Sequence, residues 1–423
     1  MASTIAVIGT GYVGLTTGAC FAHLGHTVTC ADIVEAKVSS LQRGEIPIHE
    51  AGLEEIVRTG MDNGKLSFVL GSEQAVGGAE FVYLCVPTPQ TADGSADLRA
   101  LTAAVEEISP HLQPGTVVVN KSTVPVGSTL LVEQALGRAD IPVVSNPEFL
   151  REGSAVDDFL HPDRVVIGSD DQAVADRVAS LYADCGAPIM LTDPASAETC
   201  KYAANAFLAT KLSFANAIAA VCEAVGADVN DVLLGMGYDH RIGHEFLRPG
   251  PGWGGSCLPK DSTAIISIAD GAGYDFALMR GVVEANRQQF DRIVRKVESV
   301  VPLDDASVGV LGIAFKAGTD DTRESPAIEV MKRLVAKGAT VKAYDPAVTS
   351  LDLHGVDVVD NAYAACDGVS AIVVATEWDE FTSLDLDRVG DLVAERNLID
   401  ARNLLDRVAL RQRGFTYQGV GRS

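Results

Sequence analysis

The N-terminal stretch Thr4-Ile5-Ala6-Val7-Ile8-Gly9-Thr10-Gly11-Tyr12-Val13-Gly14 is a short β-run that leads directly into a GxGxxG turn. Apolar residues at helical spacing follow as far as Gly25, and a second apolar run over residues 27–31 ends at Asp32. The glycines of such a turn allow a pyrophosphate to approach the N-terminus of the following helix closely. We therefore expect a strand–turn–helix–strand unit that binds a dinucleotide through the turn residues Gly9, Gly11, Tyr12, Val13 and Gly14.

The acidic residue at the end of the second run, Asp32, indicates which dinucleotide is bound. A carboxylate at this position accepts hydrogen bonds from a ribose diol and repels the 2′-phosphate of NADP, so it favours NAD. Lys37 follows about one helical turn later and carries a charge that would offset part of this repulsion. We predict NAD as the cofactor, and the sequence leaves the strict exclusion of NADP open.

Three further β-runs lie at residues 81–86, 117–120 and 142–145, separated by segments of helix-forming composition. This alternation predicts an α/β fold with a doubly wound parallel sheet. Each run ends in a polar loop, at residues 87–89, 121–125 and 146–152. Because ligands of open α/β sheets bind at the carboxyl ends of the strands, we expect these loops to line the site.

The composition limits the possible classes of protein. A chain of 423 residues is too long for one core, and 47% hydrophobic content is enough to build several. The formal charge of −24 disfavours non-specific binding to nucleic acid or to an anionic membrane. Scattered cysteines without a CxxC pair and an N-terminus without a signal-peptide pattern favour reduced thiols and a cytoplasmic location. His240 and His244 lack further ligand residues, so we predict no metal site.

Residues 198–225 are rich in Ala, Leu and Phe and contain almost no helix breakers, which predicts one unusually long helix. Polar residues interrupt this segment, so we do not expect it to span a membrane. Lys201 and Asn205 are four residues apart and share a helix face, where an ammonium and an amide can stabilise an oxyanion. Solvated surface polarity is the alternative for this pair. The apolar remainder of the helix predicts self-association, most simply as a homodimer.

A second α/β pattern begins after Val301-Pro302, with β-runs at residues 308–315, 340–345, 371–375 and 398–400. It lacks a GxGxxG turn, so we expect it to hold something other than a second dinucleotide. Lys316 and Arg323 are candidates for phosphate or carboxylate contacts there, and surface ion pairing with the adjacent acids is the alternative. We expect two Rossmann-like doubly wound parallel-sheet domains joined by a long central helix, divided as residues 1–196, 197–300 and 301–423.

A nucleophile candidate lies in the glycine-rich segment Gly252-Trp253-Gly254-Gly255-Ser256-Cys257-Leu258-Pro259-Lys260-Asp261. Cys257 precedes an expected helix, and the helix N-terminus favours a thiolate there. Pro259 suits the first helical turn, where its missing N–H costs nothing. Asp261 lies four residues after the cysteine, so its carboxylate would share a face with the sulfur and orient water. A buried structural cysteine in a tight loop is the alternative.

Together these residues resemble the UDP-glucose/GDP-mannose dehydrogenase family over nearly the whole chain. The resemblance rests on six segments in the order and spacing of the family: GTGYVG at 9–14, KSTVPVGST at 121–129, NPEFLREGSA at 146–155, KYAANAF at 201–207, GGSCLPKD at 254–261 and FKAGTDDTRESPA at 315–327. The segments at residues 241–250 and 419–422 resemble the UDP-glucose branch more than the GDP-mannose or UDP-N-acetylmannosamine branches. Trp253 departs from the family pattern, in which Phe or a smaller residue is frequent, and this puts the packing of its loop in doubt.

The resemblance implies an NAD-dependent four-electron oxidation of UDP-glucose at C6, from alcohol to acid, without release of the aldehyde. Cys257 would add to the aldehyde to give a thiohemiacetal, and a second hydride transfer would give a thioester that water hydrolyses. By the same analogy, Lys201 and Asn205 would stabilise the oxygen charge and Asp261 would position water. Glu148 and Thr123 would support hydrolysis. The group that takes the first proton is left open.

The resemblance also implies which residues contact the ligands. For NAD, beyond the glycine-rich turn, these are Asp32, Lys37, Thr88, Thr123, Glu152, Lys260 and Arg323. For the nucleotide sugar they are Glu148, Phe149, Leu150, Lys201, Asn205, Arg241, Phe246, Leu247, Gly254 and Lys316. In family members the positions of Arg241 and Arg323 can reach across a subunit interface, which implies an active site that needs at least a dimer.

Three other functions stay open. Within the family, GDP-mannose or a UDP-N-acetylhexosamine could replace UDP-glucose as the substrate. A two-electron dehydrogenase of the 3-hydroxyacid or 6-phosphogluconate kind also joins a Rossmann domain to a helical segment, but it needs neither Cys257 nor a second α/β domain. A non-catalytic sensor of NAD or a nucleotide sugar could keep the fold. The joint presence of Cys257, Lys201, Asn205 and Asp261 argues against the sensor.

Overall fold

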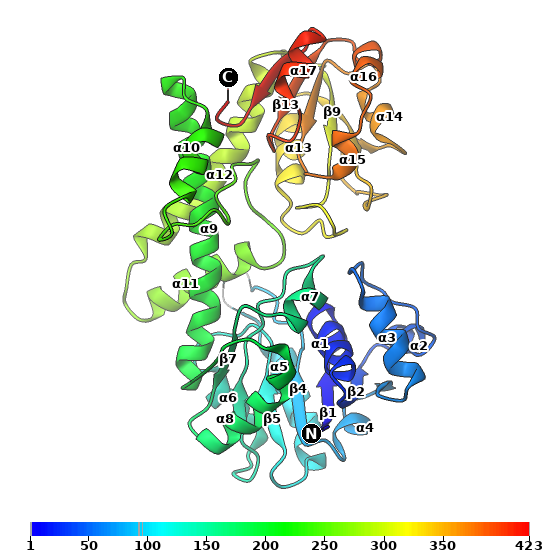
Figure 1. Cartoon of the computed structure of the whole chain (residues 1–423), viewed down its shortest axis with the longest axis vertical. Helices are drawn as coiled ribbons and strands as arrows, with labels where there is room; N and C mark the ends of the chain where they lie inside the picture. Colours follow the sequence, from blue (N-terminus) through cyan, green and yellow to red (C-terminus); the bar gives the residue numbers. More distant parts are fainter. Residues whose placement is uncertain (1, 92–93, 95, 423) are drawn as a thin grey trace. The chain divides into compact units, whose positions relative to one another are not determined.

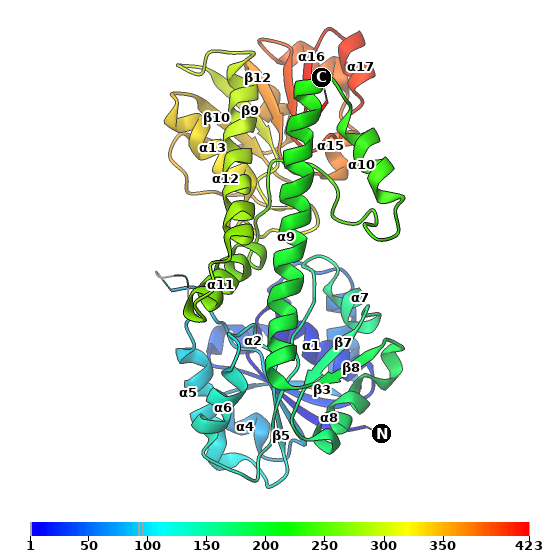
Figure 2. The ribbon, with the colours of Figure 1, turned by 90° about the vertical axis from the view of Figure 1, so that its left-hand side faces the viewer.

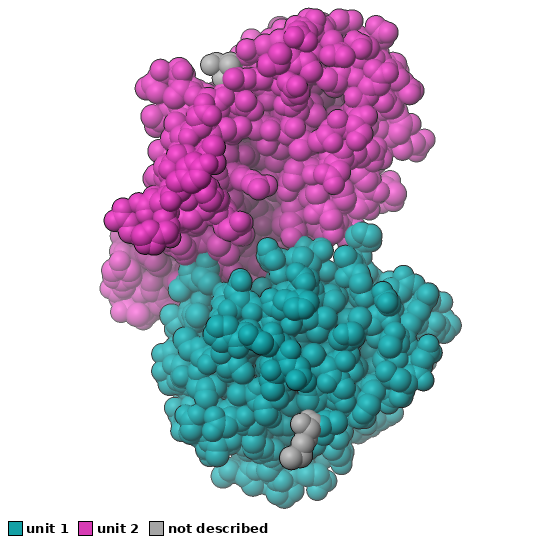
Figure 3. Space-filling view, in the orientation of Figure 1, with its two compact units in different colours: residues 1–204 teal, residues 205–423 magenta. Residues whose placement is uncertain are grey.

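The structure, a computed structural model, describes residues 2–91, 94 and 96–422. The chain forms two compact units, residues 1–204 and 205–423, which Figure 3 colours separately. The boundary between the units lies within one helix, α9 (Pro194–Val225). The three-part division at residues 196 and 300 stays a prediction.

The first unit is built on an eight-stranded sheet with the strand order β3-β2-β1-β4-β5-β6-β7-β8. Its first six strands have the 3-2-1-4-5-6 order of a Rossmann fold. Neighbouring strands run parallel except β6 and β7, which pair antiparallel. The strands are β1 (Thr4–Ile8), β2 (Thr27–Asp32), β3 (Leu66–Leu70), β4 (Phe81–Leu84), β5 (Val117–Asn120), β6 (Val143–Ser145), β7 (Val165–Gly168) and β8 (Ile189–Thr192).

Alternating side chains of these strands build a hydrophobic layer on each face of the sheet. Ile5 and Val7 of β1 pack into one layer, against α1, α3, α7 and α8, while Ala6 and Ile8 pack into the other, against α4, α5 and α6 (Figures 1 and 2). The helices are α1 (Tyr12–His23), α2 (Glu35–Gln42), α3 (Leu53–Asp62), α4 (Glu73–Val76), α5 (Arg99–Ile108), α6 (Ser128–Leu136), α7 (Ala155–Leu160) and α8 (Gln172–Ala179), with 3-10 helices η1 (Ser109–His111) and η2 (Ser180–Cys185).

The second unit repeats this architecture with a six-stranded sheet of order β11-β10-β9-β12-β13-β14. All its strand pairs are parallel, and the order is again 3-2-1-4-5-6. The strands are β9 (Ser307–Leu311), β10 (Thr340–Tyr344), β11 (Val356–Val358), β12 (Ala371–Val374), β13 (Asn397–Asp400) and β14 (Thr416–Gly419).

Helices again cover both faces of the second sheet. Residues of α9, α10, α12 and α13 pack with Val308 and Val310 on one face, and residues of α14 to α17 pack with Leu311 on the other. Beyond α9, the helices of the second unit are α10 (Val229–Gly237), α11 (Leu258–Gly271), α12 (Ala277–Glu298), α13 (Pro326–Ala336), α14 (Ala362–Cys366), α15 (Asp379–Thr382), α16 (Leu386–Leu392) and α17 (Arg407–Gln412). The predicted fold class, two Rossmann-like domains joined by a long helix, is confirmed.

The long helix α9 has 32 residues and begins four residues before the predicted position, at Pro194. By length and composition alone it could cross a membrane. Polar side chains along it are nevertheless buried and bonded inside the protein: Glu198 accepts from Gly127 N–H and Asn216 accepts from Gly250 N–H. These two polar side chains of α9 therefore have hydrogen-bond partners within the chain.

Candidate active site

The GxGxxG turn between β1 and α1 has the shape of a phosphate cradle. Gly9 has φ +96°, and a Cβ added to it would lie 2.6 Å from the Cys85 carbonyl oxygen. A Cβ at Gly14 would lie 1.9 Å from the Gly9 carbonyl oxygen, so both positions require glycine. Gly11 is the N-cap of α1, and a Cβ there would meet nothing within 4 Å. The binding of a pyrophosphate at the N-terminus of α1 stays a prediction, with which this glycine geometry is compatible.

Asp32 ends β2 beside this cradle. Its Oδ2 accepts hydrogen bonds from Thr10 N–H at 3.0 Å and Thr10 Oγ1 at 2.6 Å, and it forms an ion pair with Lys37 Nζ at 2.9 Å. Burial opposes ionisation, but the hydrogen bonds from Thr10, Lys37 and Val34 N–H outweigh it and lower the pKa of Asp32 to about 2. The group is a carboxylate throughout the physiological range, and Lys37 compensates part of its charge.

Two predicted cofactor loops, which follow β4 and β5, are tied together. Thr88 Oγ1 donates to the Thr123 carbonyl at 2.8 Å, and Ser122 Oγ donates to the Val86 carbonyl at 2.8 Å. Farther along the second loop, Glu198 of α9 accepts from Thr129 N–H and Thr129 Oγ1 at the start of α6. These bonds fix the position of Thr123 relative to the sheet.

The loop after β6 carries the predicted group Glu148, which is buried together with Lys201 of α9. Lys201 Nζ donates to Glu148 Oε1 at 2.8 Å, and Leu150 N–H donates to Glu148 Oε2 at 2.6 Å. Burial raises the pKa of Glu148, but the Lys201 charge and hydrogen bond, Leu150 N–H and the charge of Lys121 outweigh it and lower the pKa. Glu148 is thus an ionised carboxylate in a largely dry site.

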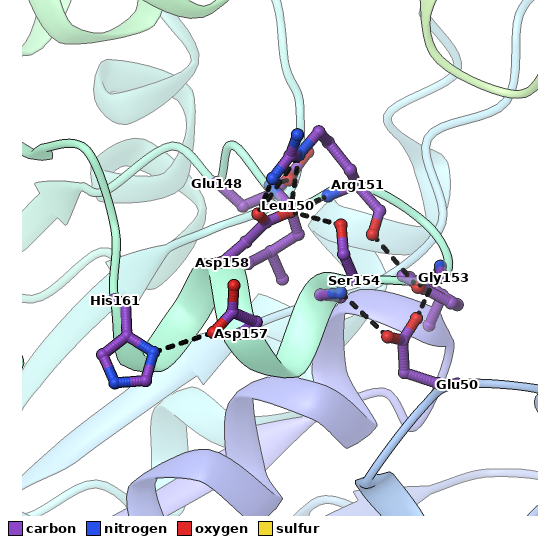
Figure 4. Close-up of polar contacts among 11 residues, drawn as sticks. Glu50, Glu148, Leu150, Arg151, Gly153, Ser154, Asp157, Asp158 and His161 are labelled. Atoms are coloured by element: carbon purple, nitrogen blue, oxygen red, sulfur yellow. Dashed lines mark hydrogen bonds and ion pairs between the residues drawn. The ribbon is translucent and has the colours of Figure 1, made fainter. Parts of the chain in front are cut away.

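The far end of the same loop is anchored by Glu50, as Figure 4 shows. Glu50 is buried; its Oε2 accepts from Gly153 N–H at 2.8 Å and its Oε1 accepts from Ala155 N–H at 2.9 Å. Arg151 pairs with Asp158 of α7 at 2.5 Å. The loop from Glu148 to α7 is therefore held at both ends by buried carboxylates, and the predicted cofactor residue Glu152 lies between them.

Beside Glu148, the predicted sugar residue Phe149 is covered on its ring face by cations. The Arg164 guanidinium lies 3.7 Å from the ring centroid and Lys201 Nζ lies 5.4 Å from it. Leu150 is half-buried and packs at the edge of the core. A cavity in the first unit is lined by Glu148, Phe149 and Leu150 together with Lys121 and Arg164.

In the second unit, Cys257 is the N-cap residue of α11, and Asp261 N–H donates to its carbonyl oxygen at 2.9 Å. All eight cysteines are free thiols, six are buried, and Cys257 is one of two that are half-exposed. Ser256 Oγ lies 3.5 Å from the Cys257 sulfur. The sequence prediction of a thiol at a helix N-terminus therefore agrees with the geometry.

The predicted partners of Cys257 cluster around a buried carboxylate, Asp261. Asn205 Nδ2 of α9 donates to Asp261 Oδ2 at 2.5 Å, and Lys260 Nζ lies 3.5 Å from Asp261 Oδ1. Asn205 is itself buried, and it follows Lys201 by one turn of α9. The structure thus contains two bonded pairs, Lys201 with Glu148 in the first unit and Asn205 with Asp261 in the second.

The glycine-rich loop before Cys257 is tightly packed. Trp253 is buried, its Nε1 donates to Ser213 Oγ at 2.9 Å, and its backbone N–H and carbonyl both bond the Asn286 amide. A Cβ at Gly254 would lie 1.9 Å from the Glu324 carbonyl oxygen, so that position admits only glycine. The tryptophan that departs from the family pattern is fully accommodated.

The remaining predicted sugar and cofactor residues lie in loops of the second unit. Arg241 is exposed and forms a two-armed ion pair with Asp239, and Arg323 does the same with Asp321. Leu247 is buried, while Phe246 has the left-handed backbone angle φ +60°, which is strained for an aromatic residue. Lys316 Nζ lies 5.6 Å from the Phe315 ring centroid. Among the described residues, no group of three or more His, Cys, Asp or Glu side chains could hold a metal ion.

Three family domains match the chain in order. The NAD binding domain of the UDP-glucose/GDP-mannose dehydrogenase family matches residues 3–185, its central domain matches residues 195–288, and its UDP binding domain matches residues 309–407. The chain belongs to this family.

Individual relatives extend over the full length of this dehydrogenase. It is 44% identical to the UDP-glucose 6-dehydrogenase TuaD of Bacillus subtilis (strain 168), and the match covers 99% of this chain and 93% of that protein. The solved UDP-glucose dehydrogenase of Pyrobaculum islandicum superposes with a TM-score of 0.93 at 36% identity, covering 100% and 98% of the two chains. The UDP-D-ManNAc dehydrogenase of Pyrococcus horikoshii gives 0.88 at 28% identity, covering 99% of each chain.

Two buried groups of the dehydrogenase were not assigned a role from the sequence. Glu50 precedes α3 and contacts a loop about a hundred residues later, so no local pattern predicts its partner. Lys121 directly follows the valine-rich strand β5 and is buried. A lysine adjoining a run of buried valines is a detectable signal, because lysine is rarely buried without a specific reason.

Proposed function

We propose that this chain is an NAD-dependent UDP-glucose 6-dehydrogenase that converts the C6 alcohol of UDP-glucose to a carboxylate. The overall reaction consumes two NAD+ and one water for each sugar. The observation that carries the proposal is the half-exposed Cys257 at the N-cap of α11, with Asp261 and Asn205 bonded one turn away. Relatives and solved structures that bear this activity in their names support UDP-glucose over the other family substrates, because the most similar of those cited are UDP-glucose enzymes.

In the proposed first step, a hydride leaves C6, the hydroxyl proton is lost to solvent, and an aldehyde forms. When bound at the glycine-rich turn, NAD+ would supply the hydride acceptor for this step. A second molecule of NAD+ would accept the second hydride. Lys201 and Asn205 stabilise the negative charge that develops on the C6 oxygen, as an ammonium and an amide can do. The bond from Lys201 to Glu148 holds that ammonium in a fixed position.

In the proposed second stage, the Cys257 sulfur adds to C6 and the aldehyde oxygen takes up a proton, giving a thiohemiacetal. Loss of a second hydride and of the hydroxyl proton leaves a thioester. Water then attacks C6, the C–S bond breaks, and the thiolate of Cys257 leaves. Glu148 accepts a proton of that water, Thr123 supports this step, and Asp261 positions the water.

We assign the ligand contacts by family resemblance. NAD would lie against Gly9, Gly11, Tyr12, Val13, Gly14, Asp32, Lys37, Thr88, Thr123, Glu152, Lys260 and Arg323. The nucleotide sugar would contact Glu148, Phe149, Leu150, Lys201, Asn205, Arg241, Phe246, Leu247, Gly254 and Lys316. The exposed positions of Arg241 and Arg323 suit residues that complete the site of a second subunit, so we propose a homodimer or a higher homo-oligomer. We propose a cytoplasmic location for it.

The test of the proposed function is a count of NADH formed per sugar. Limiting UDP-glucose is incubated with excess NAD+, and NADH is measured by absorbance while the acid is measured by chromatography. We expect two NADH and one acid per sugar. One NADH per sugar would indicate a two-electron dehydrogenase, and none would direct the same assay to GDP-mannose and UDP-hexosamines.

The covalent step is tested in the same assay with Cys257→Ser. We expect the variant to bind both ligands and to form no acid, because a serine hydroxyl is a far weaker nucleophile than a thiolate. Cys200→Ser is the matched control, since Cys200 is the other half-exposed cysteine. Wild-type acid formation by Cys257→Ser would contradict the thioester mechanism while leaving the overall reaction intact.

A further inference from the structure

Lys121 is a buried cation with an unusual set of partners. Its Nζ donates to Asn146 Oδ1 at 3.3 Å and to the Tyr182 hydroxyl at 3.4 Å. The same Nζ lies 5.8 Å from the ring centroids of both Phe159 and Tyr182. In the part of the chain that the structure describes, no carboxylate forms an ion pair with it.

The surroundings of Lys121 are organised by a chain of hydrogen bonds. The Tyr83 hydroxyl donates to the Tyr182 hydroxyl at 3.5 Å, which donates to Asn146 Oδ1 at 2.6 Å. Asn146 Nδ2 donates to the Val166 carbonyl at 2.8 Å, so the amide is fixed with its oxygen toward the ammonium. The hydrogen-bond partners of the ammonium are neutral, and Glu148 acts on it through its charge without a hydrogen bond.

A buried ammonium without a carboxylate reduces stability, because burial removes its hydration. Burial accordingly lowers the pKa of Lys121 to about 8. The ammonium is therefore largely present at neutral pH at a cost to the fold. A cost of this kind at a ligand-facing cavity suggests a functional role.

A functional group close to these partners is Glu148, which follows Asn146 by two residues and lines the same cavity as Lys121. The charge of Lys121 lowers the pKa of Glu148, in addition to the larger effect of Lys201. The other titratable groups that act on Lys121 or Glu148 are Lys201 of α9, Cys20 of α1, Cys85 after β4, and Tyr182 and Cys185 of η2. Asp158 of α7 and Arg164, which directly precedes β7, line the same cavity. Lys201 and Arg164 are the other positively charged groups among these neighbours.

We infer that Lys121 is a positioning residue of the dehydrogenase, whose ammonium, held by Asn146 and Tyr182 beneath the Asn146–Leu150 loop, keeps Glu148 ionised as the base for thioester hydrolysis. This inference rests on the proposed function, since it assigns Glu148 to the hydrolytic step. Lys201 alone would keep Glu148 ionised less effectively, because its charge is also needed to stabilise the C6 oxygen of the sugar. Lys121 lines the same cavity as the carboxylate and adds a second positive charge that acts on it.

The test compares wild type with Lys121→Met and with Lys121→Gln in the complete enzyme. For Lys121→Met we expect a thermal midpoint equal to or above that of wild type, since the desolvation cost of the buried ammonium is gone and Lys201 still pairs with Glu148. Acid formation should slow, and the acidic limb of the kcat profile should move up by about one pH unit as Glu148 loses a neighbouring positive charge. A burst of two NADH per site should precede the slow release of acid, which places the defect at hydrolysis.

Tyr182→Phe is the control for loop rigidity, because it removes a hydrogen-bond partner and keeps the ammonium. We expect its acidic limb to coincide with that of wild type. An equal shift in both variants, an unshifted limb in Lys121→Met, or failure of both neutral variants to fold would overturn the inference and make Lys121 structural.

A second readout does not depend on activity. Because the folded-state pKa of Lys121 is about 8, below the ordinary 10.5, wild type should gain stability relative to Lys121→Met as the pH rises from about 8 to 10.5. A constant difference in thermal midpoint over this range would contradict the buried charge. If wild type makes no acid from UDP-glucose, the proposed function fails, whereas this stability comparison still reports on Lys121.

Discussion

At the scale of single residues, Asp32 shows how the cofactor preference of a carboxylate depends on its neighbours. Its carboxylate is already bonded to Thr10 and Lys37 before any ligand is considered. A ribose diol that donates to Asp32 must share the carboxylate with Lys37, while a 2′-phosphate at the same place would meet both charges. Asp32 is less exposed than Lys37. The repulsion between Asp32 and the 2′-phosphate should therefore outweigh the attraction between Lys37 and that phosphate.

We expect Asp32→Asn to lower the preference for NAD over NADP by roughly tenfold or more, equivalent to about 1.4 kcal/mol, because Lys37 is then left without its partner. The measurement is kcat/KM with each cofactor. Glu35→Gln, an exposed acid in the first turn of α2, is the matched control. An unchanged cofactor preference in Asp32→Asn would show that another group sets it.

At the scale of elements, the loop from β6 to α7 depends on a carboxylate from outside it. Glu50 satisfies the N–H groups of Gly153 and Ala155 at the start of α7, two donors that the helix itself cannot pair (Figure 4). The Tyr12 hydroxyl also accepts from Gly153 N–H at 2.9 Å, which ties the start of α1 to the same point. The loop that carries Glu148 and Glu152 is thus coupled to the cofactor turn.

We expect Glu50→Gln to destabilise the enzyme by about 1–3 kcal/mol, because one buried N–H then faces an amide nitrogen instead of an oxygen. KM for NAD+ should rise more than kcat falls, since Glu152 loses its fixed position. Chemical denaturation and steady-state kinetics measure the two effects. Glu55→Gln, on the exposed face of α3, should change neither. A wild-type KM in a destabilised Glu50→Gln would limit Glu50 to a structural role.

The strands of the two sheets show what the sequence can predict at this scale. The central strands β1, β4, β5, β9 and β12 are continuous apolar runs, because both faces of a parallel sheet are covered, and they were predicted. Five strands were not predicted. Four of them, β3, β8, β11 and β14, lie at the ends of their sheets, while β7 lies inside its sheet and pairs antiparallel with β6. An edge strand has one neighbour and a more polar composition, so its sequence carries a weaker signal.

In the site, too, features set by neighbouring residues could be predicted, while contacts between residues far apart in the sequence could not. The positions of Cys257 at a helix start and of Asp261 one turn later follow from local sequence, and the structure agrees. The bonds from Lys201 to Glu148 and from Asn205 to Asp261 join residues more than fifty positions apart. No local pattern specifies such pairs, which is why the contacts of Glu50 and the partners of Lys121 also escaped prediction.

At the scale of the whole molecule, α9 has an exposed apolar face. Four large apolar side chains on this helix are exposed, with relative exposures of 64% for Phe207, 46% for Phe214, 55% for Val221 and 70% for Val225. The first three are seven residues apart and so form one stripe along the helix. An exposed apolar stripe of this length is typical of a subunit interface, and a second copy of the same helix is its simplest partner.

We expect the double substitution Phe214→Asp with Val221→Asp to convert an oligomer to a monomer, because burying two unpaired carboxylates at a helix–helix contact is strongly unfavourable. Sedimentation velocity measures the mass. If the exposed Arg241 completes the site of a neighbouring subunit, the monomer should also show a raised KM for UDP-glucose. Val408→Asp is the matched control, since Val408 is an apolar side chain of 56% exposure on α17, away from the stripe. A wild-type protein that sediments as a monomer, or a double variant that keeps the wild-type mass, would contradict an interface along α9.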